Sequence, residues 1–255
     1  MIKFFRKIRQ NLLMKNLPTG QAGKTGKPAL ATGRYFKYAI GEIILVVIGI
    51  LIALQINNWN TQKSTSNTEL EILEVMQKNL NSDLEDMKGN LDFYKIRQEA
   101  TIMVLKKLND PSFENDSLPY FYANLGLHPY FIETTSAYEN LKSIGFEIIK
   151  NDRLKESIMH IYENRYQWIE NLEDDHSHFY KTKLESLLLE NFIHESITIS
   201  AKPINIKELQ DNHFFKETLK HSLGWLTYLV DRYKKMIIDV GLLKEQITTE
   251  LKERK

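Results

Sequence analysis

Residues 38–59, YAIGEIILVVIGILIALQINNW, decide the fold of this chain, because they form an apolar run long enough to cross a bilayer. Within residues 39–56 only Glu42 and Gln55, one near each end, are strongly polar. At about 1.5 Å per residue these positions give roughly 27 Å of helix, close to the thickness of the hydrocarbon core. Trp59 supplies an amphipathic ring at interface depth. The sequence therefore predicts one transmembrane helix over residues 38–59.

The apolar run has two alternative interpretations besides a membrane anchor. A buried core helix of a soluble protein rarely stays apolar on every face for such a length. A cleaved signal peptide has a shorter basic lead and small residues after its apolar part, whereas bulky and polar residues, LQINN, follow here. The chain has no cysteine, which excludes lipoprotein anchoring, disulfide bonds and thiol catalysis. We therefore expect an uncleaved signal-anchor.

The charge distribution predicts how the chain is oriented. No acidic residue precedes Glu42, while nine basic ones do; the remaining 25 of the 34 basic residues, and all 33 acidic ones, come from Glu42 onward. Positively charged segments stay on the cytoplasmic side. We predict a cytoplasmic N-terminus and a domain over residues 60–255 outside the cytoplasm. The nine basic residues are Lys3, Arg6, Lys7, Arg9, Lys15, Lys24, Lys27, Arg34 and Lys37.

The predicted membrane helix has one face of small residues. Gly41, Leu45, Gly49 and Ala53 recur every four residues, and Gly49 and Ala53 form a small-xxx-small pair that lets two helices approach closely. We take these four positions as a candidate dimer face. Glu42 lies in the first turn, where it reaches the headgroups and the positive end of the helix dipole; an ion or proton relay is the functional alternative.

Two segments precede the membrane helix. Residues 1–16, MIKFFRKIRQNLLMKN, are basic and amphipathic, and such a segment can lie on an anionic inner leaflet. Nucleic-acid binding is the other interpretation of a basic tract, but no folded module accompanies it, so we expect no nucleic-acid partner. Residues 17–37 form a flexible linker rich in glycine and proline.

Beyond the membrane, three stretches repeat apolar residues in steps of four and three, which is typical of helices packed along a seam. A short helix over 136–144, ended by Gly145, and aromatic residues between 120 and 131 form a cap over 111–150. We expect these aromatics to be core, with a ligand pocket as the alternative. Residues 196–206 are expected to be a loop or one short extended segment. The repeats are Leu80 to Leu108, Leu154 to Phe179 with Arg165 and Trp168 on the seam, and Leu219 to Leu251.

The fold class predicted from these patterns is all-α: a single transmembrane helix, then an antiparallel bundle of three long helices with a short helical or irregular cap. Three stretches resemble a known family: MIKFFRKIR at the start, residues 38–60, and residues 134–162, TTSAYENLKSIGFEIIKNDRLKESIMHIY. The chain is similar there to uncharacterised single-pass membrane proteins of Gram-negative bacteria. Residues 17–33 depart from that family as an insertion. The resemblance implies an inner-membrane anchor and a periplasmic helical domain, and it supplies no active site.

The densest group of candidate ligands lies between residues 174 and 178. His176 and His178 point away from each other on a helix, but Asp174 and His178 are one turn apart and form a candidate metal pair. Zinc normally takes three or four ligands, so a polar break in the helical seam, which sets its register, is the alternative. The sequence contains no Gly-x-Ser-x-Gly, His-Glu-x-x-His or dinucleotide-binding motif, and it predicts no cofactor.

These observations favour an interaction or ligand-sensing module over an enzyme. Its expected partners are the lipid bilayer, a second copy of the chain, and an unidentified periplasmic or membrane protein. The alternative hypothesis is a membrane-anchored hydrolase or metal-dependent enzyme that uses the 111–150 region with Asp174 and His178.

Overall fold

The computed structural model describes residues 32–126 and 129–254, so the basic segment 1–16 and most of the predicted linker lie outside the described residues. The chain divides into two compact units, Met1–Asn60 and Thr61–Lys255. Helix α2 (Thr32–Asn109) contributes residues to both. It begins inside the predicted linker rather than at residue 38, and it continues past residue 59 because neither glycine nor proline occurs between Gly49 and Gly89.

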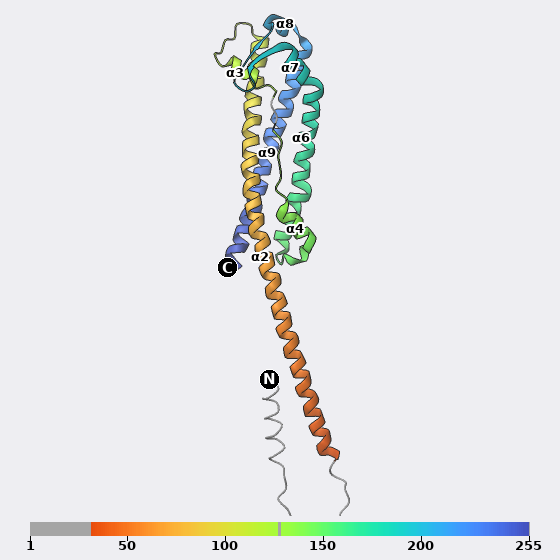
Figure 1. Ribbon diagram of the computed structural model, residues 1–255. Helices are drawn as coiled ribbons and strands as arrows, with labels where there is room; N and C mark the ends of the chain where they lie inside the picture. Colours follow the sequence, from red (N-terminus) through yellow and green to blue (C-terminus); the bar gives the residue numbers. More distant parts are fainter. Residues whose placement is uncertain (1–31, 127–128, 255) are drawn as a thin grey trace, which may run out of the picture. The chain divides into compact units, whose positions relative to one another are not determined.

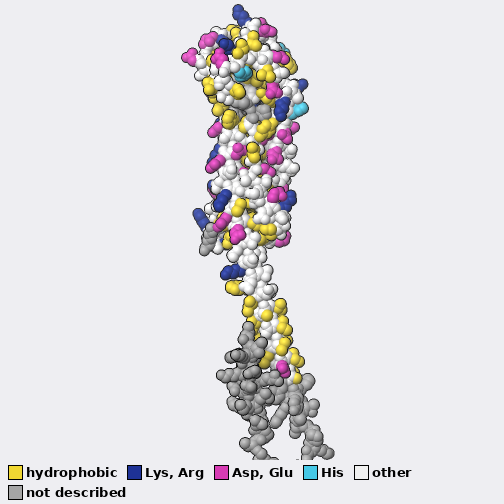
Figure 2. Space-filling model, in the orientation of Figure 1, with side chains coloured by type: hydrophobic (Ala, Val, Ile, Leu, Met, Phe, Trp, Pro, Cys, Tyr) yellow, Lys and Arg dark blue, Asp and Glu magenta, His cyan; other side chains and the backbone are white. Residues whose placement is uncertain are grey.

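In the first unit, the apolar residues of α2 are exposed. The apolar side chains between 43 and 54 face outward on all sides of the helix, which makes this part of the surface hydrophobic (Figure 2). The range Ala39–Asn109 contains a stretch that is long and apolar enough to cross a membrane, by length and composition, and none of that stretch is buried. Such a surface is stable where lipid rather than water covers it.

In the second unit, three long helical segments lie side by side (Figure 1). They are the later part of α2, helix α9 (His213–Arg254), and a middle segment between them in sequence. Gln77 of α2 hydrogen-bonds to Thr248 of α9 at 2.6 Å, and Gln98 to Thr227 at 2.9 Å. Because positions rise along α2 as they fall along α9, these two helices run in opposite directions.

Burial agrees with most positions of the seams predicted for α2 and α9, although Leu223, Ile237 and Lys244 of α9 are only partly buried. Leu80, Met87, Tyr94, Leu219 and Tyr233 are all fully buried. The core forms two apolar clusters, one along the length of the three segments and one where α2 ends and α9 begins. Burial of these rows of side chains is the main source of the unit's stability.

The middle segment differs from its prediction, because two stretches with π-helical hydrogen bonding interrupt it. Ile158 and Ile161 are buried as expected, but Arg165 and Trp168 are not; Tyr166 and Ile169, one position later, take their places. A π turn accommodates an extra residue, and this rotates the following helix by one position. The segment consists of α5 (Asp152–Met159), η2 (His160–Tyr166), α6 (Gln167–Phe179), η3 (Tyr180–Leu184) and α7 (Glu185–Asn191).

The cap region contains α3 (Leu118–Ala123), α4 (Ser136–Ile144) and the short η1 (Phe146–Ile148). The predicted helix over 136–144 is confirmed, and Gly145 ends it at φ +111°, a conformation that favours glycine. Asn151 caps α5 by accepting a hydrogen bond from the backbone of Leu154 at 3.2 Å. The side chains of Phe121, Tyr122 and Phe131 are buried, as expected for core residues, whereas those of Tyr120 and Tyr130 are exposed.

A two-stranded hairpin corrects the all-α prediction, although the chain remains predominantly helical. Strand β2 (Ser200–Pro203) lies where a loop or one extended segment was expected, and it pairs antiparallel with β1 (Phe192–Ser196), which precedes that range except for Ser196. Phe192 and Ala201 turn inward to the second core cluster, which provides the apolar contact that a lone hairpin lacks. Helix α8 (Ile206–Asp211) follows and was not predicted.

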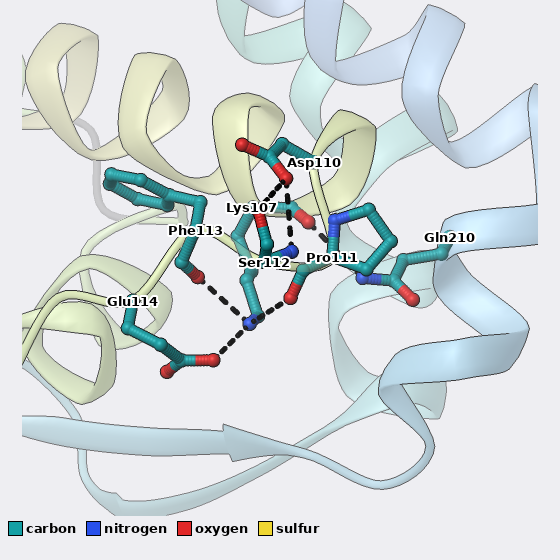
Figure 3. Close-up of polar contacts among 7 residues, drawn as sticks. All are labelled: Lys107, Asp110, Pro111, Ser112, Phe113, Glu114 and Gln210. Carbon is teal, nitrogen blue, oxygen red and sulfur yellow. Dashed lines mark hydrogen bonds and ion pairs between the residues drawn. The ribbon is translucent and has the colours of Figure 1, made fainter.

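A lysine closes the end of α2 (Figure 3). The ammonium of Lys107 donates to the carbonyl oxygens of Pro111 at 3.0 Å and Phe113 at 2.8 Å, and pairs with Glu114 at 2.7 Å. Its side chain is largely buried. The turn that follows α2 therefore has its carbonyl groups satisfied from within, by a cation that the helix itself supplies.

Candidate functional site

Residues 129–135 form a strap without regular secondary structure, and buried carboxylates hold it in place. The backbone N–H of Phe131 donates to Glu173 at 2.9 Å, and that of Thr134 donates to Asp83 at 2.9 Å. Between them, the N–H of Ile132 donates to Asp86 at 3.2 Å. An irregular segment cannot pair its own backbone amides, so the neighbouring helices supply the acceptors.

Tyrosine hydroxyls complete the bonding of these carboxylates. Glu173 accepts from Tyr94 at 3.2 Å and also from Tyr233, and Asp83 accepts from Tyr166 at 2.7 Å. Burial raises the pKa of both carboxyl groups, while the hydrogen bonds act in the opposite direction. This polar layer joins α2, α6 and α9 to the strap, and it fixes the position of the strap's remaining side chains.

A cleft of about 270 Å³ opens beside the strap. The strap contributes Glu133, α4 contributes Tyr138, Glu139 and Lys142, and the middle segment contributes Tyr162, Glu163 and Glu170. The π turn of η2 carries both Tyr162 and Glu163. Since π turns occur often at functional sites, this local geometry sets the cleft apart from the rest of the helical surface.

The charge in the cleft is predominantly negative. Its carboxylates come from four separate elements, and Lys142 is the cation that lines it. Burial, then the charges of Glu170, Asp83 and Glu139, raise the pKa of Glu133 to about 7. Like charges that lie near a carboxyl group disfavour its ionised form.

Two tyrosines form an aromatic wall of the cleft. The rings of Tyr138 and Tyr162 stack with their centroids 4.5 Å apart and an angle of 4° between their planes. The hydroxyl of Tyr138 donates to Glu163 at 2.7 Å. The hydroxyl of Tyr162 is buried and has no hydrogen-bond partner among the residues that the structure describes.

The predicted metal pair lies outside this cleft. Asp174 and His178 are both exposed on α6, one turn apart. Over residues 32–126 and 129–254, no group of three or more His, Asp or Glu residues is placed to hold a metal ion. Binding of a metal by these two residues remains a prediction, and the structure adds no third ligand to them. Their neighbours Glu173 and His176 are buried instead.

The predicted dimer face lies on the exposed part of α2. Gly41, Leu45, Gly49 and Ala53 share one face of the helix. Nothing within 4 Å would meet a side chain added at Gly41 or Gly49, so both positions are open to a second helix. Dimerisation through this face remains a prediction.

Sequence patterns did not identify the cleft. Glu163 and Glu170 looked like ordinary charges on a solvated helix face, and Tyr162 falls one position after the expected seam residue Ile161. One signal was available: the resembling stretch 134–162 supplies Tyr138, Glu139 and Lys142 as well as Tyr162. The π turn rotates the helix and brings Tyr162 and Tyr166 inward. A heptad pattern assumes a regular α-helix, so it does not indicate this rotation.

Comparison with known proteins identifies a family. Residues 42–187 match the profile of a family described as a family of unknown function (DUF6090), and this range covers more than half of the chain. It includes the apolar part of α2 and the elements that line the cleft. Neither the curated proteins nor the solved structures contain a match to the chain.

Proposed function

Since the chain belongs to this family of unknown function, we propose from its own structure that it is a membrane-anchored, non-catalytic binding module. In this proposal residues 38–59 span the inner membrane of a Gram-negative bacterium. Residues 60–255 form an antiparallel helical bundle in the periplasm, which recognises a ligand or a partner protein. Residues 1–16 lie on the cytoplasmic face, and residues 17–37 connect them to the membrane.

The exposed apolar surface of α2 supports the anchor. An isolated helix with this surface is unfavourable in water, whereas every backbone amide of a helix is already paired when it enters lipid. The nine basic residues before Glu42 support a cytoplasmic N-terminus.

The observation that carries the binding role is the cleft beside the strap. Its walls come from four elements, and hydrogen bonds to Glu173 and Asp83 hold one of them, the strap, in a defined position. Preformed concave sites with a few convergent polar groups are typical of ligand recognition. On the face that Figure 2 shows, the second unit carries a mixture of both charges, as expected for a solvated domain.

Crosslinking in native membranes tests this function. The tagged full-length chain is crosslinked, purified and analysed by mass spectrometry, beside a matched variant, Glu163→Lys/Glu170→Lys, that reverses charge in the cleft. We expect a discrete co-purifying protein or small molecule that the variant loses. Recovery of the same species with both chains, or of none with either, would contradict a binding role for the cleft.

A further inference from the structure

A second cleft, of about 160 Å³, lies between the middle segment and α9. It combines positive charge with apolar surface, and its lining includes Arg165, Trp168, Arg232, Lys235, Ile238 and Asp239. The side chain of Trp168 is 37% exposed and that of Ile238 is 61% exposed, so both are accessible to a partner. We call this the basic cleft, and the cleft beside the strap the acidic cleft.

The π turn of η2 makes the basic cleft. The heptad spacing places Arg165 and Trp168 in the core, but the rotation at the π turn buries the residue after each of them instead. The guanidinium of Arg232 then lies 5.7 Å from the ring centroid of Trp168 and 4.8 Å from that of Tyr228, which is also exposed. Tryptophan, tyrosine and arginine are the residues that most often carry the binding energy of protein interfaces. The basic cleft therefore has the composition of a protein-binding surface.

The two clefts carry opposite charge. Among the described residues, three cations and one carboxylate line the basic cleft, while four carboxylates and one cation line the acidic cleft. Surfaces of opposite charge attract each other and align as they meet. The charged residues of the acidic cleft are Glu133, Glu139, Glu163, Glu170 and Lys142.

The cations of the basic cleft already have weak partners on the same chain. Arg165 pairs with Asp239 at 3.2 Å, and Asp231 pairs with Arg232 at 3.0 Å and with Lys235 at 3.6 Å. All of these side chains are at least partly exposed. Ion pairs in contact with water contribute little to stability, so the same cations can also bind carboxylates of a partner.

The two clefts lie at the same level of the middle segment but on different sides of it. Glu163 accepts a hydrogen bond from Tyr138 of α4 at 2.7 Å, whereas Arg165, two positions later, pairs with Asp239 of α9. Copies of the chain that stand parallel and side by side therefore bring the basic cleft of one copy level with the acidic cleft of the next. Anchoring in one membrane, as proposed above, gives the copies this parallel orientation.

We infer that the basic cleft of one copy binds the acidic cleft of a second copy, so that Arg165, Arg232 and Lys235 face Glu163 and Glu170 across the interface. Two different surfaces meet in such a heterologous contact, so each copy can also bind a further one. This inference rests on the binding function proposed above and identifies the partner as a second copy of this chain.

Crosslinking of single cysteines in isolated membranes tests the inference. Gln167→Cys marks the acidic cleft and Ile238→Cys the basic cleft, both at exposed positions. The two full-length chains carry different tags, are expressed together or separately, and are treated with a short bis-maleimide. The control pair is Lys88→Cys with Ile238→Cys. Lys88 is exposed on α2 outside both clefts, and the hydrogen bond of Asn90 to Tyr233 at 3.4 Å places it at a similar level of the bundle.

We expect the two cleft positions to crosslink several-fold more than the control pair. Neither cleft cysteine should crosslink when its chain is expressed alone, because a heterologous contact does not bring the same position of two copies together. A chain that carries both Gln167→Cys and Ile238→Cys should form a ladder of dimers, trimers and larger species.

Charge reversal tests the attraction itself. Arg165→Glu/Lys235→Glu reverses the basic cleft, and Glu163→Lys/Glu170→Lys reverses the acidic cleft. Present in both chains, either change should lower the crosslinking yield at least about tenfold, since like charges then face each other at a cost of several kcal/mol. All four substitutions together should restore the yield, because the charges are again opposite, and a restored yield also shows that the reversed chain folds.

Three results would overturn the inference: equal crosslinking of the cleft pair and the control pair, crosslinking of either single-cysteine chain to itself, or a yield that the combined reversal does not restore. If copies do not crosslink through the clefts while the tagged chain still recovers another species that depends on the acidic cleft, the inference fails and the proposed function stands. If neither experiment finds a partner, both fail.

Discussion

Replacing Glu173 is the sharpest test of how the strap is held. Its carboxylate accepts from the hydroxyls of Tyr94 and Tyr233 and from the backbone N–H of Phe131, all in the buried interior. Tyr94 has a second acceptor, the carbonyl of Pro129 at 3.0 Å. Glu173→Ala therefore leaves two buried donors, the hydroxyl of Tyr233 and the backbone N–H of Phe131, without an acceptor, at a cost of about 1–3 kcal/mol each. We expect a loss of about 2–6 kcal/mol in the free energy of unfolding.

The isosteric change Glu173→Gln should cost much less. The amide oxygen of the new side chain can face the N–H of Phe131, which can only donate, while its NH₂ group faces the two hydroxyls, which can turn and accept. We expect a loss of about 1 kcal/mol. The matched control is Asp174→Ala, the next residue on the same helix but exposed, with an expected change within about 0.5 kcal/mol.

Denaturant unfolding of the four full-length proteins in detergent, followed by circular dichroism, measures these differences. The predicted order of destabilisation, from largest to smallest, is Glu173→Ala, Glu173→Gln and Asp174→Ala. If Glu173→Ala were no more destabilising than Asp174→Ala, or if glutamine cost as much as alanine, the carboxylate would not hold the strap in the way described.

Four other changes have defined outcomes. The pKa of Glu133 is raised to about 7 by burial and by the charges of Glu170, Asp83 and Glu139, so the folded state keeps a proton that the unfolded state releases. The contribution of this proton to the free energy of unfolding should be complete below about pH 4.5 and should fall as the pH rises through 7. Glu133→Gln should therefore gain stability relative to the wild type between pH 5 and 8 in parallel melts; a constant difference would contradict this. Lys107→Met leaves two carbonyls without their donor and should make the 110–117 turn more sensitive to limited proteolysis, with Lys88→Met, an exposed position on the same helix, as the control. Arg254→Ala leaves the buried Glu69 without its ion-pair partner at 2.7 Å and should lower the free energy of unfolding by about 3 kcal/mol in the same assay. Glu69→Gln/Arg254→Ala, which removes the unpaired charge, should lose less; an equally unstable double variant would contradict this. Gly49→Ile should abolish any self-crosslinking through the exposed apolar part of α2 while Ile48→Val does not; persistence of the crosslink would exclude this face.

The long repeating patterns were predictable because side-chain burial on α2 and α9 follows simple helical periodicity. The seam positions Leu80, Tyr94, Leu219 and Tyr233 are buried as the four-three spacing requires. The ends of the helices at Asn109 and Gly145 were also predictable, since proline and glycine act locally on the backbone.

What escaped prediction depends on distant contacts. The π turn of η2 moves Tyr166 inward in place of Arg165, and its hydroxyl meets Asp83, which is far away in the sequence. The hairpin is stabilised by the packing of Phe192 in the second core cluster, which the residues of its turn do not indicate. The cleft combines both effects, because the strap is placed by carboxylates on α2 and α6 that local sequence does not connect to it.

Cysteine labelling tests the central proposal most directly, namely that the second unit is anchored outside the cytoplasm. The chain contains no cysteine, so Gln10→Cys and Glu156→Cys each create a single reactive site. A membrane-impermeant maleimide is added to spheroplasts of a Gram-negative host, before and after lysis. We predict that the Glu156→Cys chain is labelled in intact spheroplasts and that the Gln10→Cys chain is labelled only after lysis. Labelling at position 10 but not at position 156 in intact spheroplasts, or at both positions only after lysis, would contradict an anchor in this orientation.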